Sequence, residues 1–111
     1  MQIDVRGRNT AVPDALREHV EKRFRTIANQ VSELARLEIE LHEEKNPSIA
    51  DGKVAEAALH LKGTTLRARE GSADITHSVD LVAEKLARQV KRHRDKRRGR
   101  RDAGAKSAPP E

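Results

Sequence analysis

The residues best suited to chemistry in this chain are the cations of one segment near its C-terminal end. Residues 85–101 contain ten basic residues and a single acid, Asp95, which gives the segment a local net charge of +9. The rest of the chain carries 13 basic and 17 acidic residues and is therefore net acidic, although the whole protein has a net charge of +5. Self-repulsion opposes such a concentration of cations unless a polyanion offsets it. The segment predicts a polyanionic partner, and nucleic acid is the first candidate.

The basic residues recur at helical spacing, so they form two neighbouring rows on a predicted helix. One row contains Lys85, Arg88, Arg92 and Lys96, the other contains Lys91, Arg94, Arg98 and Arg101, and Arg97 belongs to the same segment. A helix dipole favours two or three cations in the last turn, which is too few to explain ten. We therefore interpret these residues as a ridge that binds phosphates, and we call it the basic ridge.

Other cations could widen this footprint, although each of them alone is typical of an ordinary surface. They are Arg6 and Arg8 at the end of the first predicted strand, and Arg17, Lys22, Arg23 and Arg25 on the first predicted helix. The helix residues also stand at spacings that favour weak ion pairs with Glu18 and Glu21. We carry Arg6, Arg8, Lys22 and Arg23 forward as candidate RNA contacts.

The sequence lacks the residue patterns that are typical of metal sites and of catalytic sites. The chain has five histidines and no cysteine, and the histidines lack the tight spacing of a metal site, so we expect no metal and no cofactor. No nucleophile elbow, glycine-rich phosphate loop or carboxylate pair with acid and base spacing is present. The sequence predicts a protein that is not an enzyme and has no small-molecule substrate.

Composition also limits how RNA could be recognised and where the protein acts. Phe24 is the only aromatic residue, which argues against base stacking on an aromatic platform and favours reading of shape and phosphates. The first eight residues lack the apolar core of a signal peptide, and no apolar run approaches the ~18 residues of a membrane span. We expect a cytoplasmic protein with no membrane partner.

The elements that position the basic ridge follow from hydrophobic periodicity. Alternation around Ile3 and Val5 predicts a strand that Gly7 stops, and three- or four-residue spacing predicts an amphipathic helix over 13–30, with Pro13 as its first residue. Three more strands are predicted over 36–42, 55–62 and 66–69. A polar loop holding Asn46, Pro47, Asp51 and Gly52 precedes the third strand, and a turn at Gly63 and Thr64 joins the third and fourth strands as a hairpin.

A second helix begins after Asp74, its predicted N-cap, and runs to about Arg98. Its apolar stripe stops at Val90, so the last turns should project beyond the core. We expect one α+β domain over residues 1–101, of order βαβββα, with both helices on the apolar face of a four-stranded sheet and a Glu-rich polar face opposite. Residues 102–111 should form a disordered tail or the start of a linker.

The chain resembles the ribosome hibernation-promoting factors, also called ribosome-associated translation inhibitors, over about residues 1–98. The resemblance lies in the run Val12 to Arg17 after a strand ending Arg6-Gly7-Arg8, and in Asp80 followed by the run Lys85 to Lys96. It implies a fold similar to double-stranded RNA-binding domains and a place in the small ribosomal subunit over the tRNA and mRNA sites. By this resemblance, the family's contacts to 16S ribosomal RNA phosphates would be made in this chain by Lys85, Arg88, Lys91, Arg92, Arg94 and Lys96.

The chain departs from the family pattern in two places. Thr76 stands where a tyrosine is usual, and residues 29–31 lack the aromatics often found after the first helix. Long members of the family carry a further dimerisation domain after a linker, and this sequence contains no such domain.

The function hypothesis is a translation inhibitor that occupies the small subunit through 16S ribosomal RNA. One alternative is a generic double-stranded RNA-binding module without ribosome specificity, which would not discriminate against unrelated duplexes. Another is an interaction domain whose basic helix binds an acidic protein or an anionic membrane surface.

Overall fold

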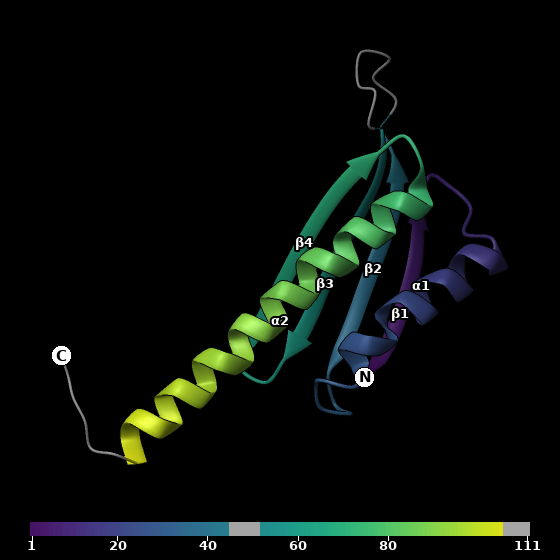
Figure 1. Ribbon diagram of the computed structural model, residues 1–111. Helices are drawn as coiled ribbons and strands as arrows, with labels where there is room; N and C mark the ends of the chain where they lie inside the picture. The colour runs from purple at the N-terminus through teal and green to yellow at the C-terminus, as the bar shows by residue number, and fades with distance from the viewer. Residues whose placement is uncertain (45–51, 106–111) are drawn as a thin grey trace.

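A computed structural model describes residues 1–44 and 52–105, with side chains up to Lys96 in the last helix. Figure 1 shows the order of its elements, which is β1 (Gln2–Arg8), α1 (Asp14–Ala28), β2 (Arg36–Glu43), β3 (Lys53–Leu61), β4 (Thr64–Ser72) and α2 (Ile75–Ala105). This is the predicted βαβββα order, so the α+β fold class is confirmed. The predicted loop holding Asn46, Pro47 and Asp51 lies outside the described residues, apart from Gly52 at its end.

The four strands form one sheet in the order β1-β2-β3-β4. β1 runs parallel to β2, and the other two pairs are antiparallel. The register aligns Ile3, Leu37, Leu59 and Leu66 in one row across the sheet. Because side chains alternate between the faces of a strand, this row and the rows two residues away form a continuous apolar face.

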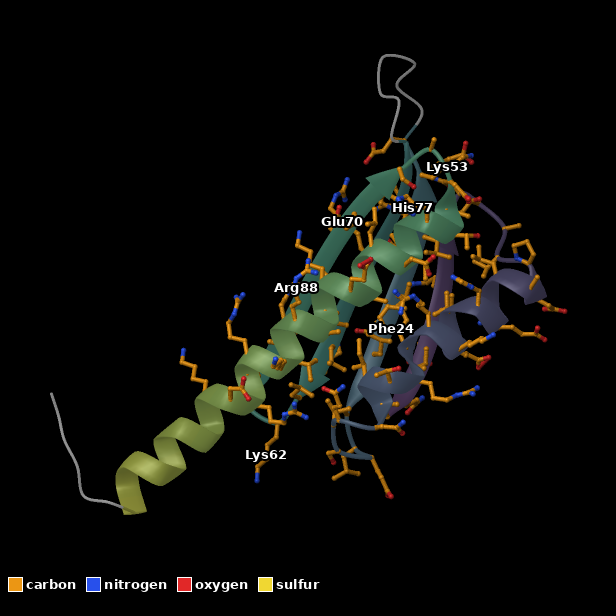
Figure 2. The ribbon with its side chains drawn as sticks, viewed as in Figure 1. Phe24, Lys53, Lys62, Glu70, His77 and Arg88 are labelled. Atoms are coloured by element: carbon orange, nitrogen blue, oxygen red, sulfur yellow. The ribbon has the colours of Figure 1, made fainter. Side chains whose placement is uncertain are left out.

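Both helices cover that apolar face, as Figure 1 shows. α1 contributes Val20, Phe24 and Ile27 to the core, and α2 contributes mainly Val79, Val82, Ala83, Leu86 and Val90. Phe24 is fully buried between the helices and the sheet, where Figure 2 labels it, so the only aromatic ring of the chain serves packing. The predicted two-layer arrangement is confirmed.

The first strand continues through Gly7, where the sequence predicted that it would stop. A Cβ atom at Gly7 would clash with the backbone carbonyl of Thr10 and contact Val12. Glycine therefore allows the chain after β1 to fold back closely against its own strand. Asn9 assists this reversal with a φ of 58°, a left-handed conformation that Asn tolerates better than most residues.

The boundaries of the first helix are tighter than predicted. Pro13 has an extended ψ of 155° and caps the helix, so Asp14 and not Pro13 is the first helical residue. α1 ends at Ala28, two residues before the predicted end, because the backbone N–H of Gln30 bonds to the carbonyl of Ile27 in a tighter turn. The end of α1 thus leads directly into the short connection to β2.

The hairpin and the start of the second helix were predicted correctly, but the turn lies one residue earlier than predicted, because Thr64 is already the first residue of β4. Leu61 pairs with Thr64, so Lys62 and Gly63 form a two-residue turn in which Gly63 has a φ of 80°. β4 runs from Thr64 to Ser72, longer than predicted. Asp74 caps α2, since its Oδ1 accepts a hydrogen bond from the backbone N–H of Thr76 at 3.0 Å.

The second helix extends further than predicted, to Ala105. Residues 102–105, expected in the disordered tail, are helical because Ala103 and Ala105 favour helix and no proline interrupts the chain before Pro109. The remainder of the predicted tail, residues 106–111, lies outside the described residues. Within residues 1–44 and 52–105, neither helix has the combination of length and apolar character that a membrane span requires.

Candidate nucleic-acid interface

The α2 helix has a buried side and a charged side. Val82, Leu86 and Val90 are buried against the sheet and α1. Arg88 and Arg92 stand two residues after Leu86 and Val90, about 200° further round the helix and so nearly opposite them, and both are exposed. Figure 2 labels Arg88 on α2. The packing of the apolar stripe therefore fixes which way the cations face.

Among the ridge residues whose side chains the structure describes, most are free for an external ligand. Five of its members are exposed, and within the described part of the chain none of them has an ion pair or a side-chain hydrogen bond: Arg88, Lys91, Arg92, Arg94 and Lys96. A cation that no protein carboxylate neutralises can offer its charge to a phosphate. The backbone of Arg97 and Arg98 continues the helix, and their side chains lie outside the described residues.

Lys85 differs from the rest of its predicted row. Its Nζ lies 3.2 Å from Glu70 Oε2 on β4, so the cation is already paired within the protein. One turn further along, Gln89 Nε2 donates a hydrogen bond to the carbonyl of Arg67 at 2.7 Å. These two contacts attach the side of α2 to the edge strand β4. Lys85 therefore helps to position the basic ridge in addition to carrying charge.

The ridge extends beyond the core, as the end of the apolar stripe at Val90 predicted. Among the described side chains of α2, none after Val90 is buried. The helix continues for fifteen residues from Lys91 to Ala105, which at 1.5 Å per residue is about 22 Å. Figure 1 shows this segment projecting past the end of the sheet. A projecting cationic helix of this length can follow a phosphate backbone over several nucleotides.

The two candidates on α1 have different surroundings. Lys22 is exposed and, among the described residues, has no ion pair. Arg23 Nε lies 3.1 Å from Asp80 Oδ1 on α2, and His19 Nε2 donates to the same oxygen at 2.7 Å. Arg23 therefore connects the two helices. This contact could not be predicted from the sequence, since the partners are 57 residues apart.

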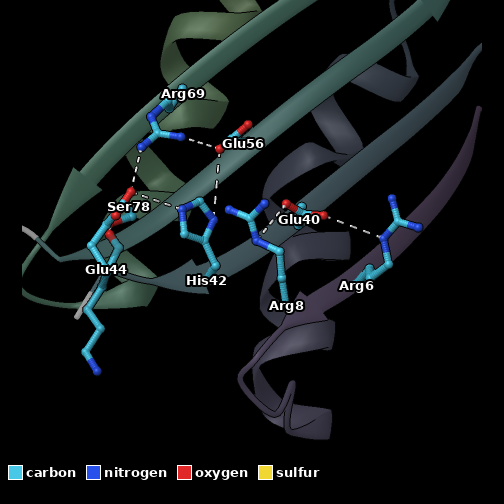
Figure 3. A network of polar contacts seen from close by, with 9 residues as sticks. Arg6, Arg8, Glu40, His42, Glu44, Glu56, Arg69 and Ser78 are labelled. Carbon is cyan, nitrogen blue, oxygen red and sulfur yellow. Dashed lines mark hydrogen bonds and ion pairs between the residues drawn. The ribbon is translucent and has the colours of Figure 1, made fainter. Parts of the chain in front are cut away.

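Arg6 and Arg8 lie on the face of the sheet that the helices leave open. Their Nε atoms are 3.9 Å and 3.6 Å from the two carboxylate oxygens of Glu40, as Figure 3 shows. The structure thus separates these two candidates from the basic ridge, which belongs to the opposite layer of the molecule. Their alternation with Ile3 and Val5 is consistent with this face, since both helices were predicted to cover the apolar side of the sheet.

The open sheet face carries the predicted Glu residues, each matched with basic partners. The pKa of the Glu38 carboxyl lies below its ordinary value of 4.5, because His60 donates a hydrogen bond to it at 2.6 Å and Arg36 donates another at 3.0 Å. The pKa of the Glu44 carboxyl is lowered by His42 and, to a lesser extent, by Arg69. This face is therefore a network of ion pairs with much of its charge internally compensated.

Glu40, His42 and Glu56 bring three potential metal ligands within 4.8 Å of one another on this face. The His42 side chain is only 5% exposed, and its Nδ1 has no hydrogen-bond partner among the described residues, with Glu56 Oε1 4.0 Å away. However, Glu40 is paired with Arg8 and Glu56 with Arg69 (Figure 3). Because guanidinium groups already neutralise both carboxylates, the donor set is poorly suited to a cation.

The chain matches a known family and known folds. Residues 3–98 match the family described as Sigma 54 modulation protein / S30EA ribosomal protein. A ribosome hibernation promotion factor of Picosynechococcus is 32% identical over 108 residues, covering 91% of this chain and 53% of the relative, so the chain spans about half the length of that protein. A ribosome hibernation promoting factor of Salmonella typhimurium is 32% identical over 96 residues, covering 86% of this chain and 96% of the relative.

Two solved structures are similar over most of the fold. A ribosomal subunit interface protein from Coxiella burnetii aligns with a TM-score of 0.73 at 28% identity, covering 86% of this chain and 99% of the other. The N-terminal domain of Protein Y from Thermus thermophilus aligns with a TM-score of 0.72 at 28% identity, covering 84% and 99%. The chain belongs to the Sigma 54 modulation protein / S30EA ribosomal protein family, and the predicted resemblance to ribosome hibernation-promoting factors is confirmed.

Proposed function

We propose that this chain is a ribosome hibernation factor, which binds the small ribosomal subunit through 16S ribosomal RNA and inhibits translation by occupying the tRNA and mRNA sites. The observation that carries the proposal is the row of exposed, unpaired cations on α2, from Arg88 to Lys96. The names of the similar proteins, ribosome hibernation promoting factor and ribosomal subunit interface protein, support the ribosome as the partner.

In this proposal the mechanism is steric exclusion and needs no catalysis. The sheet and α1 hold α2 rigidly on one side, through the apolar stripe and the Lys85–Glu70 and Arg23–Asp80 contacts. The opposite side of α2 then meets phosphates without having to order first, which reduces the entropy cost of binding. The body of the domain excludes tRNA and mRNA by filling the space they would use. A factor of this kind acts in the cytoplasm, where the ribosomes are.

The phosphate contacts should dominate the binding energy. Each phosphate contact contributes about 0.7 to 0.9 units to the slope of log K against log salt concentration. The five free described cations of the basic ridge would therefore give a slope of about −3.5 to −4.5 by themselves. Arg97 and Arg98 would make the slope steeper.

Sedimentation of the purified chain with isolated 30S subunits, across a salt series, tests this proposal. An excess of an unrelated RNA duplex of about 16 base pairs is added as competitor. Binding that falls steeply with salt but resists the duplex supports a site shaped to the ribosome. Binding that the duplex abolishes supports the alternative function, a generic double-stranded RNA-binding module. Absence of binding at low salt contradicts both.

A further inference from the structure

A groove of about 800 Å³ opens at the end of the sheet where α2 leaves the core. Three segments far apart in the sequence line it: the connection between α1 and β2, the β3–β4 hairpin turn, and α2 from Val90 to Arg94. Figure 2 labels Lys62, one of its lining residues, at this end of the sheet. We call it the end groove. Its volume is in the range of sites that hold small organic groups.

The end groove combines apolar and cationic lining. Val31 and Leu61 supply apolar surface, and Leu34 stands at its edge and is 93% exposed. Leu34 is the large hydrophobic residue that the described part of the chain leaves open to solvent. An exposed leucine beside an apolar hollow marks a surface suited to an apolar or aromatic group.

The charges in the end groove are all of one sign. Arg36, Lys62 and Arg94 line it, and no carboxylate of the described residues does. Arg36 is paired with Glu38 at 3.0 Å and with Asp4 at 3.7 Å, whereas Lys62 and Arg94 have no ion pair among the described residues. A ligand that fits must therefore offer negative charge together with an apolar body.

Two histidines, His60 and His93, complete the lining. The His60 ring is bound on the open sheet face, because its Nε2 donates to Glu38 at 2.6 Å while its Nδ1 lies 3.3 Å from Thr65 Oγ1, so His93 and Arg94 are the rings and planes available for stacking. Imidazole rings and arginine guanidinium planes both stack on nucleobases. The groove thus provides stacking surfaces that a count of phenylalanine, tyrosine and tryptophan does not reveal.

We propose that the end groove accepts an unpaired nucleobase of the RNA whose phosphates lie on the basic ridge. The inference rests on the proposed function and adds a base-binding site to it. Arg94 belongs to both the basic ridge and the end groove, so a strand that follows α2 reaches the groove without a break. This continuity favours RNA over an acidic peptide or a second copy of the chain.

The test compares two RNA pentamers of equal charge, one with ordinary bases and one abasic, bound to the ¹⁵N-labelled full chain. Both pentamers should shift the amide signals of the basic ridge, and only the base-containing one should shift those of Val31, Leu34, Leu61 and His93. The base-containing pentamer should bind on the order of tenfold more tightly, as expected when one base is stacked. Shifts confined to the ridge, with equal affinity for both pentamers, would overturn the inference and leave the proposed function intact. Absence of any shift at the ridge counts against the proposed function itself.

Two matched variants locate the effect. Leu34→Glu places a carboxylate at the groove edge, and Ala73→Glu makes the same charge change at an exposed turn between β4 and α2. Leu34→Glu should reduce the affinity for the base-containing pentamer to that for the abasic one, while Ala73→Glu should not. Equal effects of the two variants overturn the assignment. The assignment is also overturned if an acidic leucine-containing peptide displaces the base-containing pentamer and reverses the shifts of the groove signals. It is overturned as well if the chain forms a concentration-dependent dimer that Leu34→Glu disperses. Either result assigns the groove to a protein.

Discussion

Replacing Arg88 and Arg92 of α2 by glutamine should weaken binding to 30S subunits and make it less sensitive to salt. Both side chains are exposed and have no ion pair within the described residues, so glutamine removes the charge and leaves a shorter polar side chain without disturbing an internal contact. If each arginine neutralises one phosphate, the slope of log K against log salt should fall in magnitude by about 1.4 to 1.8. Taking 1 M salt as the reference, this corresponds to roughly 25- to 60-fold weaker binding at 0.1 M, or about 2 to 2.5 kcal/mol.

The matched control is Arg6→Gln with Arg8→Gln. It makes the same change of two charges, on the open sheet face, where Glu40 already pairs with both arginines. The structure therefore predicts that the slope changes by less than about 0.5 in this control. The assay is equilibrium binding of each double variant to 30S subunits at four or more salt concentrations. Equal changes of slope in the two double variants would refute the assignment of phosphate binding to α2.

Three further predictions concern the framework that holds α2. Asp80→Ala should lower the free energy of unfolding by about 1 kcal/mol, since it removes the acceptor shared by two α1 side chains, and unchanged urea denaturation would contradict this role. Gly7→Ala should cost about 1 to 3 kcal/mol in the same assay because its Cβ would clash with the Thr10 carbonyl, whereas a neutral substitution would show that the turn can relax. The lowered pKa values of Glu38 and Glu44 stabilise the fold fully above their ordinary value of 4.5, and this stability is lost as pH falls through the lowered values. Replacing both by glutamine should flatten the fall in urea midpoint as pH is lowered below 4.5, and an unchanged profile would assign acid sensitivity to other groups.

Hydrophobic periodicity was sufficient to predict the layers of this fold. The two-residue alternation around Leu37 and Leu59 buries its apolar residues on one face only if these segments are strands. The spacing from Val79 to Val90 does so only if that segment is a helix. Asp74 was predictable as a cap because its side chain acts on a neighbouring residue. The boundaries at Gly7 and Ala28 were less predictable, because they depend on how closely the chain folds back after the element ends.

The composition of the basic ridge was predictable, but the partners of individual cations were not. Helical spacing alone places Arg88 and Arg92 on one exposed side of α2. Whether a given cation is free depends on which carboxylate another element brings near it. Lys85 is paired because the β3–β4 register and the packing of α2 bring Glu70 alongside, and Arg23 is paired because α1 lies beside Asp80. The end groove could not be predicted from the sequence for the same reason, since three segments far apart in the chain form it.

Competition between this chain and tRNA for the 30S subunit tests whether the chain occupies the tRNA and mRNA sites. Subunits carrying mRNA and a labelled tRNA are titrated with the chain, and retained tRNA is measured by filter binding. If α2 and the body of the domain occupy the tRNA and mRNA sites, tRNA should be released in proportion to the chain bound, and the Arg88→Gln, Arg92→Gln double variant should need a correspondingly higher concentration. Simultaneous binding of chain and tRNA to the same subunit would contradict the account.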